Sequence, residues 1–170
     1  MARRPHMDSL ESRRLFAAVA HLYLINGELI VNGADRPDTI AVRPLATDTR
    51  YIQVQVDTVK QPRIVQNFLA ASVSTITVNG KDGDDTIAVY QITGAKRTNN
   101  VVGGAGNDKI TIYTDNAINL VGGNAGSDTI SILGGDNRIR LKDGERDYVT
   151  APAATTSFKD KDSKDKITLF

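Results

Sequence analysis

The stretch that decides the fold is Gly103-Gly104-Ala105-Gly106-Asn107-Asp108-Lys109-Ile110-Thr111. It matches the nine-residue pattern G-G-x-G-x-D-x-U-x, in which U is a large aliphatic residue. The glycines allow positive φ and a close approach of backbones in a turn. Asp108 then places a carboxylate inside that turn, and Ile110 begins a strand with its side chain toward a core. The stretch therefore predicts a tight turn followed by a short strand.

The same frame fits residues 80–88 before this stretch and residues 123–131 after it. Both copies keep the first glycine, the third glycine, the aspartate and the aliphatic residue, and both lose only the second glycine. An Asp-x-aliphatic triplet recurs more widely, with its aspartates at positions 85, 108, 128, 147 and 165 and intervals of 23, 20, 19 and 18 residues. Second strands and polar turns separate these triplets, so each coil is predicted to run strand, turn, strand, turn. Glycine-rich turns would then stack on one edge and plainer turns on the other.

These units resemble the RTX, or haemolysin-type, calcium-binding repeat family, and the resemblance covers about residues 78–170. It implies an all-β fold, a right-handed parallel β-roll or β-solenoid, in which two nonapeptides make one coil. It also implies that Ca²⁺ binds between successive turns. Segments of this family are non-catalytic modules attached to exported enzymes and toxins, or repeats of surface and adhesion proteins. The residues that the resemblance assigns to the metal are Gly80, Asp82, Gly83, Asp85, Gly103, Gly104, Gly106, Asp108, Gly123, Gly126 and Asp128.

Electrostatics supports a cation at these turns. Stacked coils lie about 4.8 Å apart, so Asp85, Asp108 and Asp128 are expected to face one another along one edge. At an effective dielectric constant near 20, each neighbouring pair would repel by roughly 3 kcal/mol. Ca²⁺ accepts six to eight oxygen ligands with loose angles, whereas Zn²⁺ prefers nitrogen or sulfur. Asp108, between two good units, is expected to matter most for calcium binding, and metal is doubtful at the poorer unit around Asp147.

A metal-free solenoid is the alternative interpretation of the same turns. Aspartate and glycine are common turn formers, and an aspartate at the start of a strand can accept hydrogen bonds from the N–H groups of its own turn. Such a chain could self-associate weakly through the apolar strand near its C-terminus, in residues 156–170. An enzyme acting on polysaccharides is the third and weakest interpretation, built from Asp115, Arg140, Lys142 and Asp143, whose spacing does not favour it.

The N-terminal part divides into two segments. Residues 1–21 are predicted to be a leader for export or sorting, because residues 10–16 resemble the LEPR-XLL leader of large exported bacterial surface proteins. An N-terminal helix is the alternative for this segment. Residues 22–72 are predicted to form an N-terminal capping β-sheet that includes a hairpin at Asn26-Gly27 and a pair of strands at 51–56 and 63–68. Residues 73–170 are predicted to form the RTX-like β-roll repeats.

Composition and charge exclude several classes of function. The 170 residues are 40% hydrophobic and 5% aromatic with no Trp, which predicts a thin, β-branched core. A net charge of +1 argues against nucleic acid as a partner, and no apolar run is long enough to span a membrane. The only histidines, His6 and His21, lie in the predicted leader. We therefore expect a secreted, calcium-binding module at the cell surface with a structural or adhesive role and no catalytic activity; the sequence does not indicate its protein or polysaccharide ligand.

Overall fold

The computed structural model describes residues 19–141 and 143–170, so most of the predicted leader, and Lys142, lie outside the described residues. The regular secondary structure of the described residues is almost entirely β-strand, with two 3₁₀ turns at Ala70–Ser72 and Ala153–Thr155. The strands are β1 (His21–Ile25), β2 (Glu28–Asn32), β3 (Asp38–Leu45), β4 (Asp48–Thr58), β5 (Ile64–Leu69), β6 (Thr75–Asp82), β7 (Thr86–Tyr90), β8 (Arg97–Ala105), β9 (Lys109–Tyr113), β10 (Ala117–Ala125), β11 (Thr129–Ile132), β12 (Asp136–Arg140), β13 (Tyr148–Ala151), β14 (Thr156–Asp160) and β15 (Lys166–Leu169).

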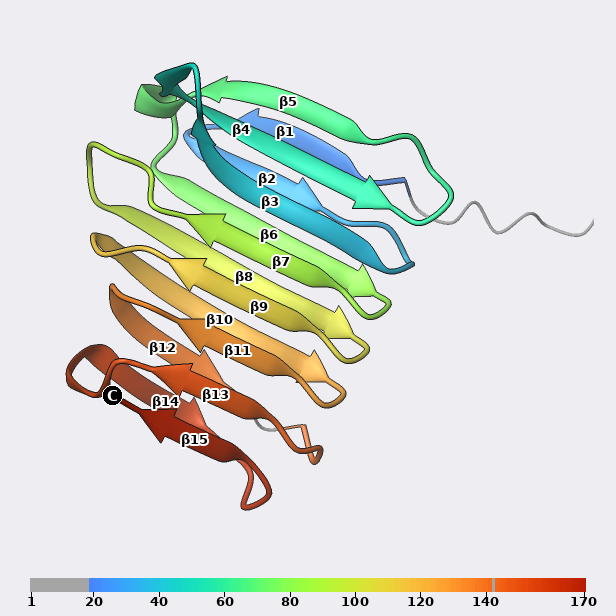
Figure 1. Cartoon of the computed structure of the whole chain (residues 1–170), viewed down its shortest axis with the longest axis vertical. Coiled ribbons are helices and arrows are strands. Elements are labelled where there is room, and N and C mark those ends of the chain that lie inside the picture. Colours follow the sequence, from blue (N-terminus) through green and yellow to red (C-terminus); the bar gives the residue numbers. More distant parts are fainter. Residues whose placement is uncertain (1–18, 142) are drawn as a thin grey trace, which may run out of the picture.

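These strands form two facing sheets. One contains seven strands in the order β1-β2-β6-β8-β10-β12-β14, and the other contains eight in the order β15-β13-β11-β9-β7-β3-β4-β5. From β6 onward the chain alternates between the sheets, and each strand pairs in parallel with the strand one coil away. Figure 1 shows the resulting stack of coils, with the N-terminal strands at one end and β14 and β15 at the other. The predicted all-β solenoid is confirmed.

The N-terminal strands combine two kinds of pairing. β1 and β2 form an antiparallel hairpin whose turn residues, Asn26 and Gly27, both have positive φ, as a type I′ turn requires. β3, β4 and β5 are also antiparallel to one another. However, β2 and β3 pair in parallel with β6 and β7. The first coil therefore lies inside the segment predicted as a cap, and the antiparallel strands β1, β4 and β5 flank it.

A thin core lies between the two sheets, because alternate side chains of each strand point inward. In the eight-stranded sheet the register aligns Ile40, Ile87, Ile110, Ile130 and Val149, all at most 2% exposed. Burying one such side chain stabilises the fold by about 1.5–3 kcal/mol. The aliphatic residue of each repeat therefore holds successive coils in register.

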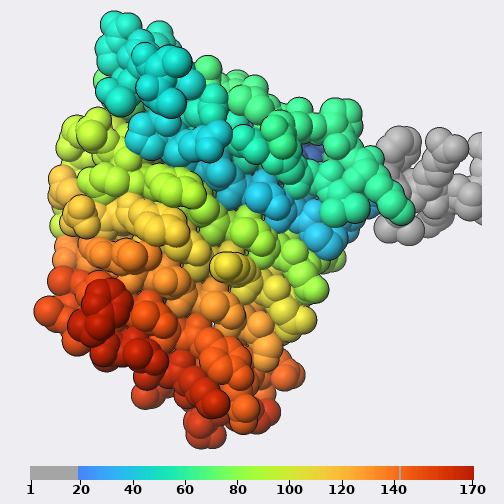
Figure 2. Space-filling model, viewed as in Figure 1, coloured from blue at the N-terminus to red at the C-terminus, as the bar shows by residue number. Residues whose placement is uncertain are grey.

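The two edges of the solenoid differ in their turns. The glycine-rich turns of the repeats lie on one edge, where β6, β8 and β10 lead into β7, β9 and β11 (Figure 1). The plainer turns lie on the opposite edge, and the space-filling view shows the coils as closely packed bands (Figure 2). Within residues 19–141 and 143–170, no helix has the length and apolarity needed to cross a membrane.

Candidate metal-binding column

Two glycines of each repeat are required for different physical reasons. The third glycine adopts positive φ in all three units, at 121° for Gly83, 134° for Gly106 and 123° for Gly126. The first glycine is required by close packing instead. A Cβ atom added to Gly103 would lie 2.2 Å from Oδ2 of Asp108, and one added to Gly123 would lie 1.7 Å from Oδ2 of Asp128. The aspartate side chain therefore folds back onto the first glycine of its own turn.

The aspartates form one buried column along this edge. Each accepts, through Oδ1, a hydrogen bond from the backbone N–H of the corresponding aspartate one coil earlier. Asp85, Asp108 and Asp128 are 1%, 2% and 0% exposed. The donor–acceptor pairs are Asp38 to Asp85 at 2.7 Å, Asp85 to Asp108, Asp108 to Asp128 and Asp128 to Asp147 at 2.8 Å each, and Asp147 to Asp165 at 3.1 Å. The carboxylates are thus linked from coil to coil through backbone N–H groups, whereas the metal-free alternative had expected each aspartate to bond the N–H groups of its own turn.

Each of the four central carboxylates keeps one oxygen without a partner. The Oδ2 atoms of Asp85, Asp108, Asp128 and Asp147 are buried and accept no hydrogen bond from the described residues. Burial raises the pKa of Asp85 and Asp128 to about 7 and that of Asp147 to about 6, although a backbone hydrogen bond lowers each of them. Neighbouring carboxylates raise these pKa values further. A buried ionised oxygen without a partner is unfavourable, so these atoms require a proton or a cation.

Asp38 begins the column and differs from the later members. Its Oδ2 accepts the N–H of Ala34 at 2.6 Å, and its Oδ1 accepts the hydroxyl of Thr58 on β4. Burial still raises the pKa of Asp38, but the Thr58 hydroxyl lowers it. Both oxygens have partners, so the N-terminal strands close this end of the column.

Three carboxylates converge where the column meets the turn after β12. Asp128, Asp143 and Asp147 each offer an oxygen, and these three atoms lie within 4.8 Å of one another. Asp128 and Asp147 are fully buried and use Oδ1 in the column, so each has its Oδ2 left over. Asp143 is exposed, and its Oδ1 accepts the N–H of Glu145 at 2.9 Å. The group is therefore open to solvent on one side and buried on the other.

The sequence pattern predicted a poor metal site at the turn before Asp147, because this turn has lost most of its glycines. The signal that it missed is Asp143, which stands at the second position of the nine-residue frame. The corresponding residues of the earlier turns are Lys81, Gly104 and Asn124. A carboxylate at this position adds a charged ligand to the two column oxygens.

The other predicted site residues lie in more varied places. Gly80 packs against Asp85 as Gly103 does against Asp108. Gly104, at the second position, has φ of 129°, and a Cβ there would lie 1.8 Å from the carbonyl oxygen of Lys81. Asp82 is exposed at the end of β6 and does not join the column.

A second, outer column runs beside the first and was not predicted. Asp84 Oδ1 accepts the N–H of Asn107 at 2.7 Å, and Asn107 Oδ1 accepts the N–H of Ser127 at 2.9 Å. The Ser127 hydroxyl then donates to the carbonyl of Arg146 at 2.7 Å. The repeat pattern accepts any residue at the fifth position, so it gave no signal for these contacts.

The residues considered for catalysis do not share one site. Asp115 lies in the turn between β9 and β10, on the plainer edge, whereas Asp143 lies on the glycine-turn edge. The column presents buried carboxylate oxygens without partners, the type of donor that a cation site uses. No family model matches the chain, and searches of curated proteins and of solved structures found no match either.

Proposed function

We propose that this chain is a calcium-binding β-solenoid module with a structural or adhesive, non-catalytic role outside the cell. The observation that carries the proposal is the convergence of Asp128, Asp143 and Asp147, two of which each have a buried oxygen that lacks a hydrogen-bond partner. The likeness of the repeats to RTX units supports the choice of ion. Export rests on the resemblance of residues 10–16 to the LEPR-XLL leader.

The donor set favours calcium among common divalent ions. All three side chains offer carboxylate oxygens, and Ca²⁺ accepts such ligands in flexible arrangements and completes its shell with water or backbone carbonyls. Mg²⁺ requires a stricter octahedron, and Zn²⁺ prefers nitrogen or sulfur ligands. The ion would take the place of the protons that the buried oxygens otherwise require.

The affinity for calcium should differ between positions along the aspartate column. The gaps at Asp85 and Asp108 also hold buried Oδ2 atoms without partners, but their second positions carry Lys81, Gly104 or Asn124 rather than a carboxylate. We therefore expect the site at Asp143 to fill first and the glycine-rich turns to bind more weakly.

Thermal unfolding with and without calcium tests the proposal. The unfolded chain lacks the assembled site, so calcium should stabilise the fold by about 2.7 kcal/mol at a hundredfold excess over Kd. For a chain of this length, that corresponds to a rise in Tm of roughly 5–10 °C. Magnesium should raise Tm much less. An equal Tm in calcium and in chelator would contradict the proposal.

A double variant separates metal binding from folding. Asp128→Asn/Asp147→Asn keeps an oxygen to accept each backbone N–H but removes both charges. We expect this variant to fold and to lose the calcium-dependent rise in Tm. Asp115→Asn is the matched control, because it removes an exposed carboxylate on the opposite edge and should leave the calcium effect intact. A double variant that responded to calcium like the parent would place the ion elsewhere.

A further inference from the structure

A trough crosses the outer face of the seven-stranded sheet, away from the aspartate column. It has a volume of about 580 Å³ and is lined by β8, β10, β12 and β14. Gly122 forms part of its floor, and a Cβ added there would meet no atom closer than 3.6 Å. Gly122 therefore contributes to the hollow, because this position has room for a side chain and glycine has none. Its volume is typical of ligand pockets.

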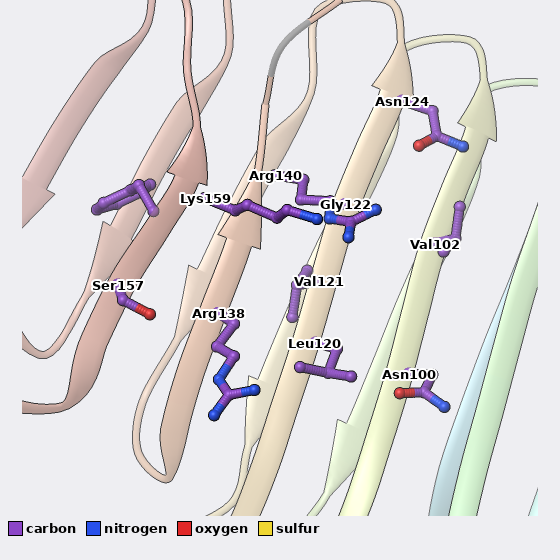
Figure 3. A pocket seen from close by; sticks show the side chains of 11 residues that line it. Asn100, Val102, Leu120, Val121, Gly122, Asn124, Arg138, Arg140, Ser157 and Lys159 are labelled. Carbon is purple, nitrogen blue, oxygen red and sulfur yellow. The ribbon is translucent and has the colours of Figure 1, made fainter.

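Three cations border the trough: Arg138, Arg140 and Lys159. In Figure 3 the Lys159 side chain extends from β14 across β12, in the direction of the labelled Arg140 and Gly122. Among the described residues, none of the three forms an ion pair within 4 Å, although Asp160 pairs with Arg140 in the strand register. Such convergence of unpaired positive charge favours an anionic ligand.

The rest of the lining is neutral and partly apolar. Leu120 is 37% exposed on the floor, its register partner Asn100 on β8 adds an amide group beside it, and Asn124 adds another nearer the end of β10 (Figure 3). The Asn100 side chain is held beside β6, because its Nδ2 donates to the Thr77 hydroxyl at 3.4 Å. Nucleic acid fits this lining poorly, because single strands bind through aromatic stacking platforms and the only aromatic residue here, Phe158, is partly buried against the core.

We propose that this trough binds an acidic oligosaccharide, whose ring faces lie on Leu120 and whose acidic groups contact Arg138, Arg140 and Lys159. Four strands separated by about 4.8 Å give the trough a length of roughly 14 Å across the strands, which exceeds the size of a single anion. Planar guanidinium groups pair with carboxylate or sulfate groups through two parallel hydrogen bonds. Amides and exposed apolar carbons complement sugar hydroxyls and ring faces. This site is independent of calcium binding at the column.

Titration calorimetry of the full chain tests the proposal with defined probes. Oligogalacturonate carries carboxylates, heparin oligosaccharide carries sulfates, and maltohexaose is a neutral control. We expect at least one acidic probe to bind, more weakly at high salt, and maltohexaose not to bind. The acidic probe that binds more tightly identifies the acidic group. Absence of binding by both acidic probes, or equal binding of oligothymidylate, would overturn the proposal.

Variants distinguish the trough from general surface charge. Arg140→Gln/Lys159→Gln should weaken binding about tenfold or more, because charged hydrogen bonds are lost. Arg43→Gln/Lys109→Gln removes the same charge from the eight-stranded sheet and should leave affinity unchanged. Gly122→Leu keeps every charge but fills the hollow, and it should also weaken binding. Equal losses in the two double variants, or full affinity in a folded Gly122→Leu variant, would mean that the trough is not the site.

Discussion

Two columns of side chains run along the solenoid, and they satisfy their hydrogen bonds in different ways. On the plainer edge, Asn99 donates to Asn119 at 2.9 Å, and Asn119 donates to Asn137 at 2.8 Å. On the glycine-turn edge, the aspartates accept backbone N–H groups instead. An amide is both donor and acceptor, whereas an ionised carboxylate only accepts. The asparagine column therefore satisfies itself, and the aspartate column leaves one buried oxygen on each central member.

The difference explains why only one edge is a candidate site. A buried ladder of amides rigidifies a coil, but its amide oxygens already accept hydrogen bonds and are not free to bind an ion. Unpaired carboxylate oxygens, in contrast, make the stability of the fold depend on protons or cations from the solvent. The same stacking geometry thus serves structure on one edge and, in our proposal, ion binding on the other.

The largest expected effect is the pH dependence of the calcium-free chain. Asp85, Asp128 and Asp147 have folded-state pKa values of about 7, about 7 and about 6, above the ordinary value of 3.8. The folded state therefore binds more protons than the unfolded state, and its stability is complete below about pH 4 and is lost as pH rises through about 7. Each pKa unit corresponds to about 1.4 kcal/mol, and between pH 5 and pH 8 each of the three carboxyls passes through at least about one unit, so Tm in chelator should fall by about 10 °C or more.

Saturating calcium should abolish most of this fall, because the ion replaces the protons. Asp85→Asn/Asp128→Asn should also flatten the curve, since it makes part of the aspartate column resemble the asparagine column. Melting curves across this pH range measure both effects. A Tm in chelator that rises from pH 5 to pH 8 would show that the aspartate column does not make the folded state more stable at low pH.

A smaller effect should appear when one member of each column is truncated. Asn119→Ala leaves Asn99 and Asn137 without their partners and should cost about 3 kcal/mol or more. Asp128→Ala removes the acceptor for the Asp108 N–H but also removes an unpaired oxygen, so it should cost only about 1–2 kcal/mol at neutral pH. Urea unfolding at pH 7 in chelator measures both. Equal losses would mean that the columns are energetically alike.

The sequence predicted the fold well because the repeat encodes it locally. The turns require positive φ at Gly106 and Gly126, which favours glycine there. The aliphatic residue that follows each aspartate lies on the buried face of its strand. The hairpin at Asn26 and Gly27 was likewise predicted from turn chemistry and is confirmed. Each of these features depends on residues adjacent in sequence.

The candidate site was less predictable because its contacts cross between coils. Asp108 was expected to face other carboxylates, but its Oδ1 accepts a backbone N–H from the coil before it. The gathering of Asp143 with Asp128 and Asp147 depends on how a degenerate turn folds over its neighbour. The nine-residue pattern carries no information about either contact, and the asparagine column lies outside the pattern altogether.

The smallest expected effect concerns the last coil, where both columns stop. Asn137 donates to Thr156, and Asp147 donates its N–H to Asp165, with no described coil beyond them. Each strand of this coil, β14 and β15, pairs with only one described neighbour.

Leu169, at the end of β15, and Phe170, next to it, are 45% and 66% exposed, which favours pairing with a second copy. Four lysines oppose it, because charged residues on or beside an edge strand disfavour association: Lys159 and Lys166 on the strands, and Lys161 and Lys164 in the turn between them. We therefore expect weak, concentration-dependent self-association through residues 156–170, measured by sedimentation equilibrium. Leu169→Lys/Phe170→Lys should abolish it, whereas Val65→Lys, on the edge strand β5 at the other end, should not. A parent chain that stays monomeric at high concentration, or an equal loss in both variants, would show that the open end of the two columns does not recruit a partner.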